Sequence, residues 1–276
     1  MPDTSVSRPM TLLSISIVCY QPDFERLTLL FNSLARAVSL LAQQGEQTQV
    51  FLVDHGQQGA LLAKFCQRYQ ASLKIELLEN PANPGFGAGH NLALKQANSR
   101  FHLVLNPDVV VPDATLTTLL AFARSHPDVV ALSPEVRDAG GKLQYLCKTR
   151  PSVLDLALRG FAPAWLKQVF SARLGRYEYR TMVDTRTPAK VELLSGCFML
   201  CRTRALQTTG FDEGYFLYFE DFALSHALHR YGELRYLPEA CIVHFGGNSS
   251  AKGLSHIRYF LASAWRYFNQ FGWRLW

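Results

Sequence analysis

The 276-residue sequence lacks the features that would export it or anchor it in a bilayer. Its first ten residues contain no basic stretch followed by an apolar one, so no export signal is expected. No uncharged apolar run reaches the roughly 18 residues of a membrane-spanning helix. The six cysteines form no CxxC pair. This pattern favours buried, reduced thiols over a disulfide framework, and the sequence therefore predicts a cytoplasmic protein.

Charged residues are also scarce, at 18% of the chain, and their balance is +6. A mildly basic surface favours anionic partners such as nucleotides, phosphates or acidic lipids, but the charge alone does not choose among them. The first half shows no continuous basic stripe, so no nucleic-acid partner is expected. The 48% apolar content is enough to bury a full core.

The first half of the chain alternates short β-branched runs with segments of helical periodicity. Strands are expected at 12–20, 49–54, 73–78, 101–106 and 129–134, and helices at 24–44, 60–70, 88–98 and 114–125. This alternation predicts an α/β fold in one domain: a Rossmann-like, mostly parallel sheet with right-handed crossovers and helices on both faces. The first half is thus of a nucleotide-binding type.

The second half is less regular. Basic side chains outnumber acidic ones in 145–190 and alternate with aromatic residues. This insertion could contact a phosphorylated or membrane-borne acceptor, and a plain surface helical insertion is the alternative. A strand and turn follow at 191–202, then a helix at 219–231 and strands near 234–237 and 241–244. The tail 257–276 has three arginines and no acid, and predicts an amphipathic helix on an anionic bilayer or packed on the protein.

Ligands of an open parallel sheet bind beyond the carboxyl ends of its strands, so the polar residues there are candidates. Asp54 ends the second strand and could accept hydrogen bonds from a base or ribose, or merely cap a turn. Gly85, Gly87 and Gly89 precede a helix, where glycine permits close backbone approach and the helix N-terminus favours an anion. Their spacing is not the dinucleotide motif, and a simple turn is the alternative.

Three further positions carry candidate catalytic or metal chemistry. Asp108 follows an apolar strand and could hold Mg²⁺ or Mn²⁺ between phosphates, or belong to a Pro-Asp turn. Glu220 and Asp221 begin a helix, where an acid can be a general base or simply complement the helix dipole. His244 ends a strand beside a glycine loop and could complete a cation's coordination, although a lone histidine is commonly structural.

In this order, a set of motifs between about residues 12 and 250 resembles the inverting family 2 glycosyltransferases of the GT-A fold, and most closely a rhamnosyltransferase-like branch. The motifs are VCYQPD, FLVDHG, NPGFGAGHN, LNPDVVV, LLSGCFMLCR, GFDEGYFLYFED and IVHFGGNSS. The ordered set is far more specific than any one of its members. The resemblance implies an enzyme that moves a sugar from a nucleoside diphosphate to an acceptor.

The resemblance also implies roles for individual residues. Asp221 would be the catalytic base and Glu220 its supporting neighbour. Asp108 would be the last acid of a DxD-like metal motif and His244 a second group near metal and diphosphate. The residues implied beside the donor nucleotide are Tyr20, Asp54, Gly85, Phe86, Gly87, Asn91 and Asn106. The sequence continues EDFAL, with Ala223 where many relatives have a further aspartate, which leaves a helper carboxylate in doubt.

From the resemblance we expect an N-terminal tail at 1–10, a nucleotide-sugar-binding half at 11–135, an acceptor and catalytic half at 136–250, and a C-terminal amphipathic helix at 251–276. The donor would be a nucleoside-diphosphate sugar such as dTDP-L-rhamnose. The acceptor would be a glycan or polyprenyl-linked sugar of cell-wall or lipopolysaccharide synthesis, met at the inner face of the cytoplasmic membrane.

Two alternatives remain at this point. A sugar-phosphate nucleotidyltransferase would need a basic, glycine-rich loop near its N-terminus, and the run CYQPDFER has no glycine. A non-catalytic basic membrane-binding module would be expected to lack a base or metal residue, whereas Asp108, Asp221 and His244 are all present.

Overall fold

The computed structural model describes residues 10–246 and 253–276. The expected N-terminal tail lies outside this range except for Met10. So do residues 247–250 of the glycine loop after His244 and residues 251–252 of the expected C-terminal helix.

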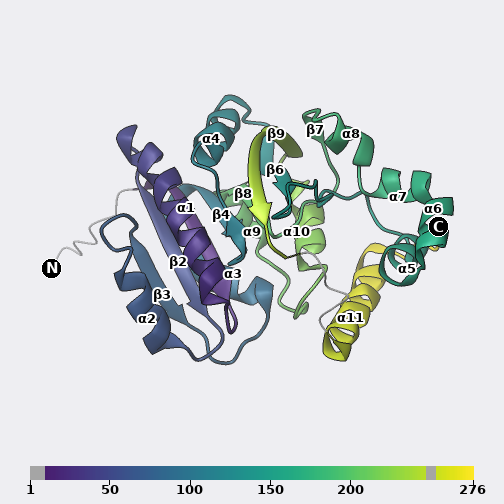
Figure 1. Cartoon of the computed structure of the whole chain (residues 1–276), viewed down its shortest axis with the longest axis horizontal. Coiled ribbons are helices and arrows are strands. Elements are labelled where there is room, and N and C mark those ends of the chain that lie inside the picture. The colour runs from purple at the N-terminus through teal and green to yellow at the C-terminus, as the bar shows by residue number, and fades with distance from the viewer. Residues whose placement is uncertain (1–9, 247–252) are drawn as a thin grey trace.

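The first half is the expected alternation of strands and helices (Figure 1). Its elements are β1 (Thr11–Cys19), α1 (Phe24–Gln43), β2 (Thr48–Asp54), α2 (Gly59–Gln67), β3 (Ile75–Glu79), α3 (Phe86–Gln96) and β4 (Ser99–Leu105). The four strands pair in parallel in the order β3-β2-β1-β4. Parallel pairing brings the carboxyl ends of these strands to one edge, where the candidate residues follow them.

The elements after β4 extend the same sheet with mixed pairing. They are β5 (Val109–Val110), α4 (Thr115–Ser125), β6 (Val129–Arg137), β7 (Ala189–Lys190), β8 (Phe198–Arg202), α9 (Thr203–Thr209), α10 (Glu220–Leu228) and β9 (Glu233–His244). Strand β8 lies antiparallel between β4 and β6, and β9 runs parallel to β6. The segments expected as two strands are one strand, β9, whose pairing with β6 shifts register after Pro134.

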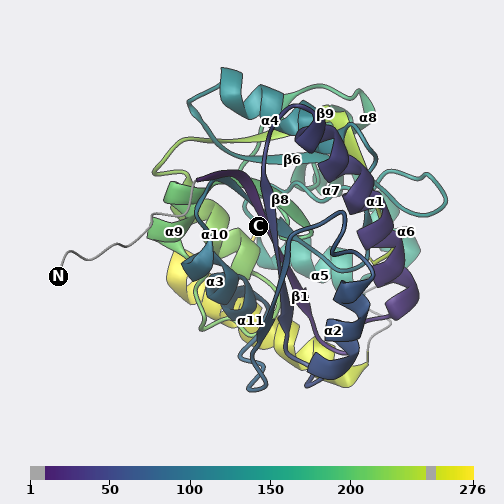
Figure 2. The ribbon, with the colours of Figure 1, turned by 90° about the vertical axis from the view of Figure 1, so that its left-hand side faces the viewer.

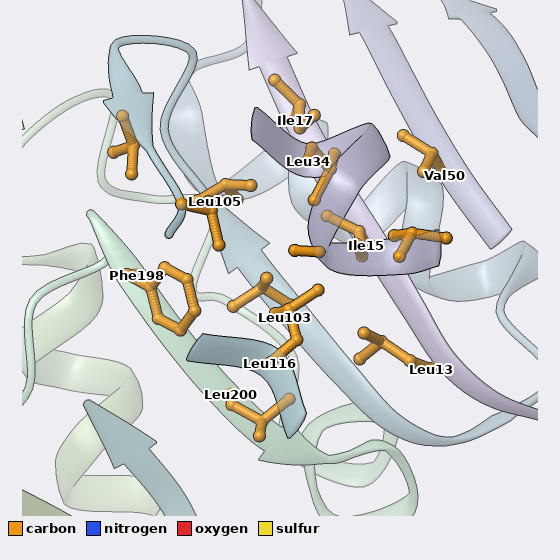
Figure 3. Close-up of a cluster of buried hydrophobic side chains, with 14 of the residues drawn as sticks. Leu13, Ile15, Ile17, Leu34, Val50, Leu103, Leu105, Leu116, Phe198 and Leu200 are labelled. Atoms are coloured by element: carbon orange, nitrogen blue, oxygen red, sulfur yellow. The ribbon is translucent and has the colours of Figure 1, made fainter. Parts of the chain in front are cut away.

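Helices cover both faces of the sheet, as expected. Figure 2 shows α1 on one side of β1 and α3 with α10 on the other. On the α1 face, Leu13, Ile15 and Ile17 of β1 pack with residues of α1, β4 and β8 (Figure 3). Each such fully buried side chain contributes about 1.5–3 kcal/mol relative to exposure.

The opposite face of β1 carries a series of buried polar side chains that hydrogen-bond to one another. Ser14 and Ser16 alternate with the apolar residues and face α3. The imidazole of His102 lies 2.6 Å from the Ser14 hydroxyl and 2.8 Å from the Ser16 hydroxyl, and Ser16 in turn lies 2.6 Å from His90 of α3. Burial lowers the pKa of His102 to about 3, so its ring is neutral. These bonds fasten α3 to the sheet beneath the candidate site.

The basic insertion folds into four short helices: α5 (Val153–Phe161), α6 (Ala164–Val169), α7 (Ser171–Tyr177) and α8 (Arg180–Asp184). Ser152 begins α5 with a capping box, in which its hydroxyl accepts from the Asp155 N–H and the Asp155 carboxylate accepts from the Ser152 N–H. The insertion is therefore helical, which is compatible with both interpretations of its sequence.

The tail forms α11 (Leu254–Phe271), which ends at Phe271 and does not run on to Trp276. Gly272 has a φ of 90° and breaks the helix. The chain then turns back onto α5, where the N–H of Val153 donates to the carbonyl of Arg274 at 2.8 Å. One face of α11 is buried through Ala264, Tyr267 and Phe268, so the tail does pack on the protein.

The six cysteines are free thiols, and all except Cys241 are buried, as the sequence predicts. Across the parts of the chain that the structure covers, no helix has both the length and the apolar character needed to cross a bilayer.

Candidate active site

A cavity of about 290 Å³ opens where β4, β8 and β9 meet the first turn of α10. The expected site residues that line it are Phe86, Asn106, Asp108, Glu220, Asp221 and His244. They come from distant parts of the chain: Asn106 and Asp108 follow β4, His244 ends β9, and the two acids begin α10. The fold thus gathers the candidate base and the candidate metal ligands in one cavity.

Asp221 is held rigidly in the cavity wall. One carboxylate oxygen accepts the N–H of Gly196 at 2.9 Å, and the other accepts the N–H of Phe222 at 2.9 Å. Burial raises the pKa of Asp221, while these hydrogen bonds and one from Ser195 oppose that increase. A carboxylate with a raised pKa is a stronger proton acceptor than an ordinary surface aspartate.

Gly196 allows this arrangement because it carries no side chain. A Cβ there would lie 3.0 Å from the Phe86 ring and 3.5 Å from the Cβ of Asp221. The loop that donates to Asp221 therefore approaches α10 and α3 more closely than other residues would permit.

Glu220 precedes Asp221 in the chain and is only 5% exposed. Within residues 10–246 and 253–276, its Oε2 atom is buried without a hydrogen-bond partner. Burial, together with the neighbouring Asp221 charge, raises the pKa of Glu220 well above its ordinary value. Glu220 therefore holds its proton more tightly than a normal glutamate, and while it carries that proton it cannot take one from a substrate.

The aromatic loop before α10 is strained. Tyr218 and Phe219 have φ values of 72° and 67°, in the left-handed region that bulky residues rarely adopt. Such conformations persist only where surrounding contacts impose them. Here Phe219 is buried against Tyr267 and Phe260 of α11, which fixes how α10 presents its two acids.

Asp108 and His244 face each other at the other side of the cavity. The Nε2 atom of His244 lies 3.5 Å from Oδ1 of Asp108. The described portion of the chain holds no cluster of three or more His, Cys, Asp or Glu side chains arranged for a metal. A carboxylate and an imidazole still fit Mg²⁺ or Mn²⁺ bound largely by phosphate oxygens and water, which is how these cations usually bind in nucleotide sites.

Gln144 determines which nitrogen of His244 faces Asp108. Its amide nitrogen donates to the carbonyl oxygens of His244 at 2.9 Å and of Gly246 at 3.2 Å. This orientation places the amide oxygen 2.9 Å from Nδ1 of His244, where it can only accept. In the neutral ring the proton therefore lies on Nδ1, and Nε2 carries the lone pair that binds a metal.

Gly246 leaves the space around these two groups open. A Cβ at this position would come within 2.7 Å of both Oδ2 of Asp108 and Nε2 of His244. A backbone cradle that a single methyl group would fill is consistent with a site shaped to admit a cation.

The remaining donor-side candidates lie outside the cavity lining. Asp54 uses its two oxygens for the N–H groups of Gly56, at 2.7 Å, and Gln58, at 2.6 Å. Its carboxylate thus shapes the loop after β2, although each oxygen retains capacity for a further bond. Tyr20 follows β1 and is 58% exposed.

The glycines around the start of α3 serve close packing within the protein. A Cβ on Gly85, where φ is 112°, would lie 2.3 Å from the Phe216 carbonyl oxygen, and one on Gly87 would lie 2.7 Å from Phe211. Asn91 accepts the Phe211 N–H at 2.8 Å and donates to the Phe211 carbonyl and to Glu213, both at 2.9 Å. These contacts attach the loop before α10 to α3.

Sequence reasoning missed several residues of the site. Gln144 and Gly246 act on His244, and Lys148, Arg159 and Tyr177 form a further wall of the cavity. Gly196 and Gly246 had a visible signal, because they lie within the motifs LLSGCFMLCR and IVHFGGNSS, and Lys148 and Arg159 belong to the basic insertion.

The family model described as glycosyl transferase family 2 matches residues 14–210, which is most of the chain. The chain is a family 2 glycosyltransferase. It is 29% identical over 217 residues to the N-acetylglucosaminyl-diphospho-decaprenol L-rhamnosyltransferase of Mycobacterium tuberculosis, an alignment that covers 74% of this chain and 68% of that one. It is 26% identical over 227 residues to the rhamnosyltransferase WbbL of Escherichia coli K12, covering 78% and 80%.

Solved structures share the fold of this glycosyltransferase. The S. aureus TarS 1–349 structure matches with a TM-score of 0.56 at 18% identity, over 84% of this chain and 60% of that one. GalNAc-T7 with UDP, GalNAc and Mn²⁺ matches with a TM-score of 0.61 at 13% identity, over 85% and 43%. The chain thus spans less than two thirds of either solved chain, and the likeness confirms the expected GT-A fold.

Proposed function

We propose that this glycosyltransferase transfers L-rhamnose from a nucleoside diphosphate, such as dTDP-L-rhamnose, to an amino sugar on a lipid diphosphate. The relative from M. tuberculosis is named for that donor sugar and acceptor, and WbbL for rhamnosyl transfer. Membership of the glycosyltransferase family argues against both alternatives that the sequence left open, the nucleotidyltransferase and the non-catalytic module. The product would serve cell-wall or lipopolysaccharide synthesis.

The observation that carries the proposal is the shared cavity of Asp221, Asp108 and His244. In a one-step displacement, the acceptor hydroxyl loses its proton to Asp221 as its oxygen forms a bond to the anomeric carbon. The bond from that carbon to the diphosphate oxygen breaks on the opposite face, so the configuration inverts. Asp221 is the base because hydrogen bonds fix both of its oxygens in the cavity wall. Glu220 also lines the cavity, but it is more deeply buried and holds its proton more tightly than an ordinary glutamate.

Asp108 and His244 would hold Mg²⁺ or Mn²⁺, and a cation there would supply positive charge to the leaving diphosphate. Their own contribution is orientation, since Gln144 fixes the His244 ring and Gly246 leaves room beside it. The nucleotide would lie over the loops at Tyr20 and Asp54 and the start of α3, from Gly85 to Asn91, with Asn106 at the diphosphate. The Asp54 oxygens would use their remaining lone pairs to accept hydrogen bonds from the nucleotide base.

The proposal includes binding at the inner face of the cytoplasmic membrane. Trp165 of α6 and Trp265 of α11 are 66% and 63% exposed, and Leu261 is 54% exposed. Indole rings are favoured at a bilayer interface. The segment 257–276 has three arginines and no acidic residue, which favours anionic lipid headgroups.

The proposal is tested by nucleoside-diphosphate release from a panel of sugar nucleotides, with an N-acetylglucosaminyl-diphospho-lipid acceptor, in Mn²⁺ and then in chelator. We expect acceptor-dependent release from one deoxysugar donor, lost in chelator. Nuclear magnetic resonance of the product gives the anomeric configuration. Release from an unrelated donor, or retention of configuration, would contradict the proposal.

A further inference from the structure

One wall of the cavity holds more positive than negative charge. Glu178, at the end of α7, is buried and contacts three cations. Its carboxylate lies 3.3 Å from Nζ of Lys148, 3.0 Å from Nε of Arg159 and 2.7 Å from Nη2 of Arg180. Three cations thus surround one carboxylate, and the surplus charge remains to be balanced.

Two of these cations face the cavity that contains Asp221. Lys148 and Arg159 both line it, together with Tyr177. Lys148 is only 3% exposed, and burial, with the nearby Arg159 charge, lowers its pKa to about 7. Arg159 is 48% exposed and pairs with Glu178 through its Nε atom.

These cations come from a different part of the chain than the candidate metal ligands. They belong to the insertion 145–190, whereas Asp108 and His244 stand at the ends of β4 and β9. Within the residues that the structure covers, the ion pairs of Lys148 and Arg159 are made with Glu178 and not with the acids of the site. In the proposed function the donor diphosphate lies beside Asp108 and His244, which leaves Lys148 and Arg159 for a second anionic group.

An apolar edge continues outward from Arg159. Phe161 ends α5 and is 60% exposed, and Trp165 and Val169 of α6 are 66% and 70% exposed. The cavity lining thus combines the Asp221 carboxylate with a pair of cations, and helices α5 and α6 of the same insertion add an exposed apolar surface. A sugar hydroxyl, a diphosphate and a lipid chain are the matching parts of the acceptor of the proposed function.

We infer that Arg159 and Lys148 form an acceptor-phosphate subsite, which selects acceptors whose sugar is linked to lipid through phosphate. This inference rests on the proposed function and adds the residues that recognise the acceptor. A guanidinium is suited to this role because it donates two parallel hydrogen bonds to phosphate oxygens. Glu178 orients both cations and is a positioning residue.

The test is donor-free binding in chelator, which removes any cation at Asp108. Two probes are compared by calorimetry: farnesyl-diphospho-N-acetylglucosamine, and the farnesyl glycoside of the same sugar without phosphate. They are titrated into the wild type, Arg159→Gln, and the matched control Arg176→Gln, which removes an exposed arginine of α7 outside the cavity lining. Arg159→Lys tests whether charge alone is enough.

We expect Arg159→Gln to weaken binding of the diphosphate probe about tenfold or more, the size of one lost charged hydrogen bond. Binding of the phosphate-free probe should stay unchanged, Arg176→Gln should bind both probes like the wild type, and Arg159→Lys should recover part of the loss. Equal effects of Arg159→Gln on both probes, or on neither, would overturn the inference. Failure of the proposed function is separate, since it appears as absent sugar transfer by the wild type.

Discussion

Gln144 holds the His244 ring in the orientation that points Nε2 toward Asp108. The amide of Gln144 cannot reverse without facing its oxygen toward the carbonyl groups of His244 and Gly246. The orientation of a proposed metal ligand is thus set by a neutral residue that belongs to neither metal-binding motif.

Gln144→Leu should lower Mn²⁺ affinity about 10–100-fold, the usual cost of losing a partner that orients a ligand. Electron paramagnetic resonance of free Mn²⁺ measures this without any substrate. The control is Gln67→Leu, on the exposed surface of α2. Equal Mn²⁺ affinity in the two variants would remove His244 from the proposed site.

Gly246→Ala should impair metal binding while leaving the fold intact. The added methyl group would lie 2.7 Å from both Asp108 Oδ2 and His244 Nε2, in the space the cation would need. Gly160→Ala is the matched control, because a Cβ there meets nothing within 4 Å. Titration of activity with Mn²⁺ should show a higher half-saturating concentration in the first variant alone.

Asp221→Asn should lower kcat about 10²–10⁴-fold, the usual contribution of a general base. The affinity for donor should change little, because Asp221 contacts the acceptor in the proposed mechanism. Stopped-flow transfer and equilibrium donor binding separate the two, with Glu239→Gln as an exposed carboxylate control. Retention of kcat would assign the base elsewhere.

The transfer rate should fall on acidification at a higher pH than an ordinary aspartate would give, about 3.9. Burial raises the pKa of Asp221, and only the deprotonated carboxylate accepts a proton. A pH profile of kcat measures the midpoint. A rate that stays level down to pH 4 would contradict the assignment.

Glu220→Gln should stabilise the protein increasingly as pH rises. The pKa of Glu220 is raised on folding, so above the ordinary value of about 4.3 the folded state binds more protons than the unfolded state. Stability of the wild type therefore falls as pH rises toward the folded pKa, and the neutral amide removes that loss. Urea unfolding at pH 5 and pH 8 measures the difference. If the variant's stability advantage over the wild type became smaller as pH rises, the prediction would be contradicted.

Replacing Trp165 and Trp265 together by serine should weaken binding to vesicles that contain anionic lipid about tenfold or more, since each replacement removes a large exposed apolar surface. Leu61→Ser on α2, where Leu61 is 57% exposed, is the control at the other end of the molecule (Figure 1). Vesicle sedimentation measures the affinity. Equal binding by all variants would place membrane contact on another surface.

Local periodicity was enough to predict β1, α1 and β2, because each has a long and regular pattern of apolar residues. It could not reveal β5, which has only Val109 and Val110 and exists because β9 pairs with it. Nor could it show that β8 separates β4 from β6, since that neighbour relation depends on contacts between distant segments.

The site shows the same division. Asp108, Asp221 and His244 belong to motifs that can be recognised in the sequence, and the fold brings them into one cavity. The basic character of 145–190 was visible in the sequence, but the meeting of Lys148 and Arg159 at Glu178 was not, because it depends on the folding of the insertion. The glycines before α3 were visible as glycines, but their protein neighbours Phe211 and Phe216 were not.

The strand order also sets a constraint during synthesis on the ribosome. Strand β4 ends at Leu105 and β6 at Arg137, yet the strand that joins them, Phe198–Arg202, emerges later, and β9 later still. Until then both earlier strands present open hydrogen-bonding edges, which are prone to pair with other nascent chains. Slow translation between residues 137 and 198 would prolong that exposure, so the yield of this glycosyltransferase should depend on elongation speed and chaperone supply across that interval.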